Sequence, residues 1–123
     1  MEFWKHIEKR SVGLKSLSNS ERGLWAELVV LRLLNEKQVK IISHRKKYPF
    51  GEIDIVGFHK ETYLLFEVKY LDNEWRIFER IKLAQLKKIK NNLLYFTSRS
   101  KNAKAYLVFV SSEARCNFVD INS

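Results

Sequence analysis

Hydrophobic residues at helical spacing predict two amphipathic helices in this chain. The first covers residues 18–35, where Ser18 and Glu21 have the spacing of a capping box and mark its beginning. The second covers residues 76–96, in which apolar residues recur at helical intervals. Serine and glycine weaken the helical pattern near the N-terminus, so residues 1–17 are expected to form an N-terminal extension or a further helix.

Short apolar or alternating runs predict five strands. These are residues 39–43, 52–58, 63–69, 105–110 and 117–121. The basic segment 44–50 is expected to be an exposed loop, and the polar residues 59–62 a hairpin connection. The resulting order is α-β-β-β-α-β-β. A run of strands flanked by helices favours the α/β class, with a mixed central sheet and helices packed on it.

Length and composition place the chain among globular proteins. Its 123 residues, 46% hydrophobic and 30% charged, predict one domain over residues 1–123. Cys116 is the only cysteine, which excludes an intrachain disulfide and a cysteine-based zinc site. No apolar leader and no membrane-length apolar run is present. We therefore expect a cytoplasmic protein without a membrane span.

The charge balance favours an anionic partner. The chain has 23 Lys+Arg against 14 Asp+Glu, a formal net charge of +9. Nucleic acid is the first candidate and an acidic membrane surface the second. A basic protein without such a partner is the alternative, because charge alone does not identify a ligand.

Acidic side chains share one face of the strand expected at residues 52–58. Successive side chains on a strand point to opposite faces. Glu52 and Asp54 should therefore lie on one side, while Ile53 and Ile55 lie on the other.

The strand expected at residues 63–69 carries Glu67 and Lys69 on one face. A hairpin through residues 59–62 would place Asp54 beside Glu67. Two such carboxylates repel each other across strands. A hard divalent cation such as Mg²⁺ removes the repulsion, and Lys69 would add positive charge for a phosphate. The alternative is a solvated hairpin face on which Lys69 forms an ion pair with either acid.

Glu27 is a third acidic candidate. It lies on or beside the apolar stripe of the first helix, three residues after Leu24 and four before Leu31. Its carboxylate would either reach the rim and find a surface partner, or point into the sheet and contribute a metal or water ligand.

Three motifs follow one another along the chain: Gly23-x-x-x-Glu27, Gly51-Glu52-Ile53-Asp54 and Glu67-Val68-Lys69. Together they resemble the PD-(D/E)XK nuclease superfamily, over roughly residues 20–110. The second and third motifs most resemble the YraN-like family of small proteins with proposed endonuclease activity. The spacing in the first motif is also similar to that of the archaeal Holliday-junction resolvases.

The resemblance implies a restriction-endonuclease-like core and a Mg²⁺ or Mn²⁺ site. By motif, Asp54 and Glu67 would be metal ligands, together with the carbonyl of Val68. Lys69 would be catalytic, and Glu27 would be an accessory ligand. Resolvase-like relatives work as dimers, which makes a homodimer the expectation by analogy.

Basic residues next to the motifs are the candidates for nucleic-acid binding. Before the second motif these are Arg45, Lys46, Lys47 and Tyr48, which combine phosphate contact with base stacking. The second helix contributes Lys82, Gln85 and Lys88. A solvated loop and a solvated helix face are the alternatives.

The leading hypothesis is a metal-dependent endonuclease that hydrolyses phosphodiester bonds in DNA. Branched or single-stranded recombination and repair intermediates are the candidate substrates, because the chain has no motif for base-specific recognition. The alternative is a non-catalytic nucleic-acid-binding module that keeps the nuclease fold. A third hypothesis is an interaction protein whose basic helix binds an acidic partner.

Overall fold

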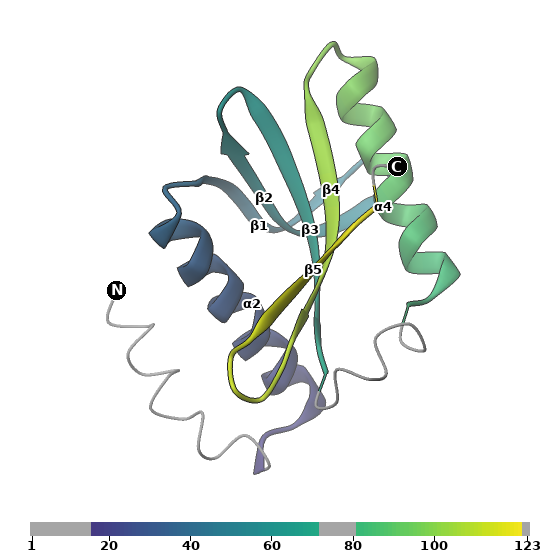
Figure 1. Ribbon diagram of the computed structural model, residues 1–123. Coiled ribbons are helices and arrows are strands. Elements are labelled where there is room, and N and C mark those ends of the chain that lie inside the picture. The colour runs from purple at the N-terminus through teal and green to yellow at the C-terminus, as the bar shows by residue number, and fades with distance from the viewer. Residues whose placement is uncertain (1–15, 72–80, 122–123) are drawn as a thin grey trace.

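A computed structural model of the chain describes residues 16–71 and 81–121 (Figure 1). The elements are α2 (Asn19–Glu36), β1 (Lys40–Tyr48), β2 (Gly51–His59), β3 (Thr62–Tyr70), α4 (Leu83–Ser98), β4 (Ala103–Val110) and β5 (Cys116–Asp120). The order α-β-β-β-α-β-β is the one that the hydrophobic pattern predicts.

The five strands form one mixed sheet in the order β1-β2-β3-β4-β5. Neighbouring strands are antiparallel except β3 and β4, which are parallel over their whole length. A parallel pair needs a crossover connection, and α4 lies within that connection. The predicted α/β class with a mixed central sheet is confirmed.

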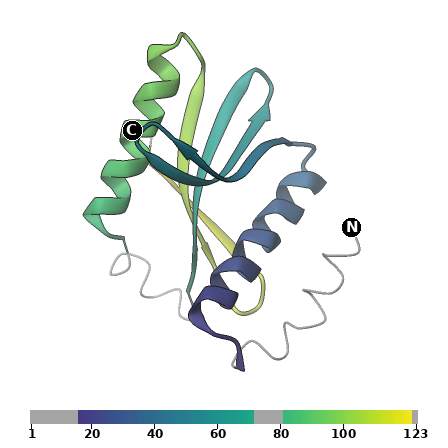
Figure 2. The ribbon, with the colours of Figure 1, turned by 180° about the vertical axis from the view of Figure 1, so that it is seen from behind.

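Helices α2 and α4 cover opposite faces of the sheet (Figures 1 and 2). Trp25 and Leu28 of α2 pack in a buried cluster with Phe66 of β3. On the other face, Ile89 of α4 packs in a second cluster with Leu107 of β4. Burial of each such side chain contributes about 1.5–3 kcal/mol, so both helices are held mainly by their apolar faces.

The beginning of α2 agrees with the predicted capping box. The Ser18 hydroxyl accepts a hydrogen bond from the Glu21 N–H at 3.1 Å, and the Glu21 carboxylate accepts from the Ser18 N–H at 2.9 Å. The cap fixes where the helix begins, and therefore which of its residues reach the sheet two turns later.

The basic segment 44–50 is not the predicted loop. Most of it continues β1, and only Pro49 and Phe50 form the turn into β2. Its backbone pairs with β2 up to Tyr48↔Gly51. The sequence pattern missed this strand because its side chains are charged. An edge strand can keep its backbone paired on one side while its side chains stay in water, so it does not need an apolar pattern.

Helix α4 begins at Leu83, later than the predicted residue 76. Ile81 and Lys82 are not helical, and Lys82 has extended backbone angles and no side-chain cap. Helical periodicity without a capping residue does not locate the first turn. Residues 76–80 of this helix lie outside the described residues, and so do residues 1–15 of the extension or helix expected at residues 1–17.

Strand β2 breaks the expected alternation. Ile53 packs in the cluster on the α4 side and Ile55 in the cluster on the α2 side, so the prediction that they share a face is wrong. Opposite this point Arg45 of β1, which lies between His44 and Lys46, has a φ of +56°. A left-handed residue interrupts the regular pleat, and β2 turns over at Asp54.

Candidate functional site

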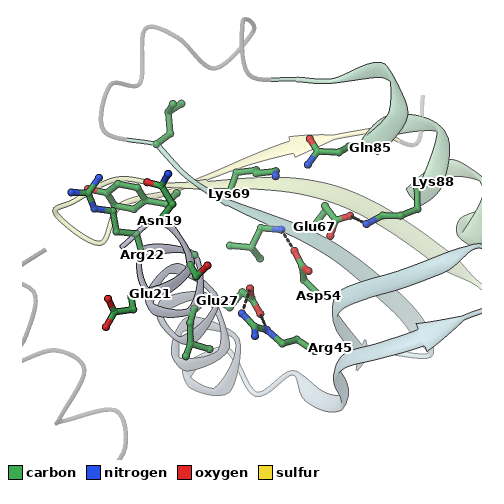
Figure 3. Close-up of a pocket in the computed structure, with 16 residues that line it drawn as sticks. Asn19, Glu21, Arg22, Glu27, Arg45, Asp54, Glu67, Lys69, Gln85 and Lys88 are labelled. Carbon is green, nitrogen blue, oxygen red and sulfur yellow. Dashed lines mark hydrogen bonds and ion pairs between the residues drawn. The ribbon is translucent and has the colours of Figure 1, made fainter. Parts of the chain in front are cut away.

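Asp54 and Glu67 meet where β2 and β3 separate. The two strands pair from His59↔Thr62 to Ile55↔Phe66, and the pairing ends there. The N–H of Val68 therefore has no backbone acceptor on β2, and it donates to Asp54 Oδ2 at 2.8 Å instead (Figure 3). The predicted meeting of Asp54 and Glu67 is confirmed, and Val68 holds the Asp54 carboxyl in place.

The surroundings of Asp54 disfavour the charged form of its carboxyl. Burial raises the pKa of Asp54 to about 8, reinforced by a hydrogen bond to Glu67 and by the charge of Glu67, while the Val68 N–H opposes the shift. A pair of this kind retains a proton near neutral pH, or requires a cation to replace it.

Lys88 supplies positive charge beside this pair. Its Nζ lies 2.6 Å from Glu67 Oε2, in an ion pair without the angles of a hydrogen bond. The Glu67 side chain is only 4% exposed, whereas that of Lys88 is 33% exposed. A carboxylate so deeply buried is costly unless it is paired, and Lys88 provides the charge from α4.

Glu27 is directed toward β1 rather than toward the Asp54–Glu67 pair (Figure 3). Its carboxylate accepts two hydrogen bonds from Arg45, at 2.9 and 3.1 Å, and forms a third with His44 Nε2 at 2.8 Å. The hydrogen-bonded Glu27 raises the pKa of Arg45. Glu27 lines the same pocket as Asp54, but its immediate partners are basic side chains.

The acids line a pocket of about 840 Å³ between the ends of α2, β3 and α4. Lys69 and Gln85 line it together with Lys88, and Figure 3 shows Lys69 pointing toward Gln85 and Glu67. Within the described part of the chain, Lys69 forms no ion pair. The pocket thus combines two adjoining carboxyls with two lysines.

The structure brings only some of the predicted nucleic-acid contacts to this pocket. Arg45, Gln85 and Lys88 line it. The remaining four do not: these are Lys46, Lys47, Tyr48 and Lys82. The centroids of the Tyr48 and Phe96 rings lie 5.5 Å apart, and the Tyr48 hydroxyl forms a hydrogen bond of 2.7 Å with the Ser43 hydroxyl. Tyr48 therefore holds the β1–β2 turn against α4.

Three features of the site were not predicted: the two basic partners of Glu27, the ion pair of Lys88, and the role of Asn92. Asn92 is fully buried and accepts a hydrogen bond from the Phe50 N–H at 3.1 Å while donating to the Gly51 carbonyl at 3.3 Å. A signal was available: Gln85, Lys88 and Asn92 follow each other at three- and four-residue intervals, so they share one face of a helix.

Fold and site together define an α/β protein with a five-stranded mixed sheet and a paired-carboxyl pocket at the point where two central strands separate. Residues 26–121, more than half of the chain, match the family described as Uncharacterised protein family UPF0102. The chain belongs to this family, which confirms the YraN-like resemblance.

Individual relatives carry the same family description. The chain is 38% identical over 69 residues to a UPF0102 protein of Fervidobacterium nodosum, covering 56% of this chain and 51% of the relative. It is 41% identical over 51 residues to one of Francisella tularensis subsp. novicida, covering 41% and 44%. A Shewanella denitrificans relative is 28% identical over 98 residues, covering 78% and 82%. The chain thus spans about half the length of the first two relatives.

Of the helices within residues 16–71 and 81–121, none combines the length and the apolar character that crossing a membrane requires.

Proposed function

We propose that this protein is a metal-dependent endonuclease of the PD-(D/E)XK superfamily that hydrolyses phosphodiester bonds in DNA. The observation that carries the proposal is the pair formed by half-buried Asp54 and buried Glu67, which lines a pocket that also contains Lys69. Branched or single-stranded intermediates of recombination and repair are the substrates that we favour. A cytoplasmic location and a homodimer belong to the same proposal.

The donor set fits Mg²⁺ or Mn²⁺. Within residues 16–71 and 81–121, no three His, Cys, Asp or Glu side chains converge closely enough to hold a metal by themselves. Mg²⁺ does not need three, because it is bound by one or two carboxylates with water and substrate phosphate. Asp54 and Glu67 would hold it with the Val68 carbonyl, and Glu27 would contribute through water. When bound, the metal would polarise the phosphate and lower the pKa of a water.

Residues of the chain would orient the metal ligands, contact the phosphate and orient the attacking water. Asp54 and Glu67 lie on the adjacent strands β2 and β3, and the Val68 N–H donates to the Asp54 carboxyl and orients it. Lys69 is available to contact a phosphate oxygen or to orient the attacking water. Gln85 and Lys88 lie on the α4 side of the pocket, where the DNA backbone would approach.

Cleavage assays test the proposal. The protein is incubated with Mg²⁺ or Mn²⁺ and with duplex, flap, four-way-junction, single-stranded DNA and RNA. We expect wild type to cut at least one DNA substrate, and Asp54→Asn and Lys69→Met to lose at least about 100-fold in rate, as removal of a key electrostatic group does. Exposed Glu113→Gln and Lys104→Met are the matched controls.

Equal activity in wild type and the two site variants would overturn the assignment. Binding without cleavage on every substrate would instead support a non-catalytic nucleic-acid-binding module. One observation favours that second candidate: Glu67 and Glu27 are already neutralised by Lys88 and Arg45, so these two acids do not need a metal to be stable in the fold.

A further inference from the structure

We propose that Lys88 is a built-in counter-ion that balances Glu67 until a divalent cation binds, and that its ammonium then moves to a nucleic-acid phosphate. Metal binding and phosphate binding would thereby be coupled through one side chain. This inference rests on the proposed function, because it takes Glu67 to be a metal ligand.

The Lys88 ammonium lies against the carboxylate that a metal would bind. Lys88 Nζ lies 2.6 Å from Glu67 Oε2, which is the place a cation on the acid pair would take. The same ammonium also offsets the repulsion that the charge of Glu67 exerts on the adjoining Asp54 carboxyl. A metal at this pair and the Lys88 ammonium would compete for the same carboxylate.

The Lys88 side chain passes close to the backbone of Gly51 on its way to Glu67. A Cβ on Gly51 would lie 3.0 Å from Cδ and 3.2 Å from Cγ of Lys88, closer than side chains normally approach. Gly51 also has a φ of +123°, which favours glycine. The first residue of β2 therefore leaves room for the Lys88 stem to pass over the backbone and reach Glu67.

Helix α4 is anchored to the rest of the fold by buried residues just after Lys88. Ile89, next to Lys88, is 1% exposed, and Asn92, one turn later, is fully buried and bonded to the β1–β2 turn. The backbone of α4 is therefore fixed around Lys88, while the Lys88 side chain itself is one-third exposed to the pocket. Displacement from Glu67 requires only rotation of a flexible side chain.

Lys69 and Lys88 then have different tasks. Within the described residues Lys69 forms no ion pair, so it is available to a phosphate from the start. Lys88 becomes available only when a cation takes its place on Glu67. By linkage, phosphate that captures Lys88 must also strengthen metal binding, by the same factor with which metal strengthens phosphate binding.

Calorimetric titration with Mn²⁺ measures the first half of this coupling. Lys88→Met removes the ammonium and keeps an apolar stem, and Lys87→Met is the matched control on the exposed face of the same helix. We expect Lys88→Met to bind Mn²⁺ about tenfold more tightly than Lys87→Met, because no ammonium competes for Glu67. Lys88→Arg keeps a cation and should stay within about twofold of wild type.

Binding of a labelled four-way junction measures the second half, in Ca²⁺ and in EDTA. Wild type and Lys87→Met should gain affinity when Ca²⁺ is added, whereas Lys88→Met should lose most of that gain. Equal Mn²⁺ affinities for the two methionine variants, or an undiminished gain in Lys88→Met, would overturn the inference. Wild type that cuts DNA with either result leaves the proposed function standing, whereas wild type that binds no Mn²⁺ removes both.

Discussion

At the residue scale, Asp54 is an acid whose folded environment disfavours its charge. Burial and the adjoining Glu67 raise its pKa to about 8, from an ordinary value of 3.8. Between these two values the folded protein holds a proton that the unfolded chain has released. Stability without metal should therefore fall as the pH rises from about 4, and the loss should level off above about 8.

Urea unfolding in EDTA across this pH range checks the expectation. Asp54→Asn cannot release a proton, and its amide oxygen can still accept from Val68. The stability of wild type minus that of Asp54→Asn should decrease with rising pH, and Mg²⁺ should restore wild type alone. Glu113→Gln, at an exposed acid, should follow wild type. A difference that does not change with pH would show that Asp54 ionises normally.

Residue types and the hairpin spacing predicted that Asp54 and Glu67 meet, because a short turn between two adjacent strands brings positions on either side of it together. The partners of Glu27 were beyond that argument. His44 and Arg45 reach Glu27 because a strand assumed to be a loop lies beside α2, and because Arg45 has a left-handed backbone. A side chain's partner across 17 or 18 residues depends on packing that no local pattern contains.

At the element scale, Glu27 and Arg45 join α2 to β1. The Glu27 side chain is 8% exposed, so loss of Arg45 leaves a buried carboxylate whose remaining side-chain partner among the described residues is His44. The Arg45 side chain is itself nearly half exposed, so water screens its attraction to Glu27 and reduces what the ion pair contributes to stability. We expect Arg45→Met to cost about 1–3 kcal/mol of unfolding free energy.

A double-mutant cycle with Glu27→Gln measures the coupling by urea unfolding. Glu27→Gln removes the charge that needs Arg45, so Arg45→Met should cost markedly less in that background. Lys47→Met, an exposed cation two residues further along β1, is the control. Additive effects of the two substitutions would mean that the bidentate contact contributes little to stability.

Asn92 fixes α4 to the turn between β1 and β2. It is fully buried, and both ends of its amide are bonded to the backbone of Phe50 and Gly51. Asn92→Ala leaves these backbone groups without their partner and should cost about 1–3 kcal/mol. The half-buried neighbour Asn91→Ala is the control, and urea unfolding is the measurement. Equal stability of both variants would show that the turn does not depend on α4.

At the scale of the whole molecule, a formal net charge of +9 should make nucleic-acid binding depend strongly on salt. A complex with about four phosphate contacts loses roughly a hundredfold in affinity between about 50 and 200 mM salt. Fluorescence anisotropy with a labelled four-way junction measures how steeply the logarithm of the affinity falls with the logarithm of the salt concentration. With Ca²⁺ present, Lys88→Met should reduce this slope by about one, which corresponds to one lost phosphate contact, whereas Lys87→Met should leave it unchanged. Affinity independent of salt would argue against a phosphate ligand.

The sequence by itself determined the element order, the α/β class, the cap of α2 and the pairing of Asp54 with Glu67. Each of these follows from periodicity or from residues close together along the chain. The tertiary structure alone decided that β2 turns over at Asp54, that β2 and β3 separate beyond Ile55↔Phe66, and that α4 delivers Lys88 to Glu67. These depend on how edge strand and crossover helix pack against the sheet, and contacts between distant segments set that packing.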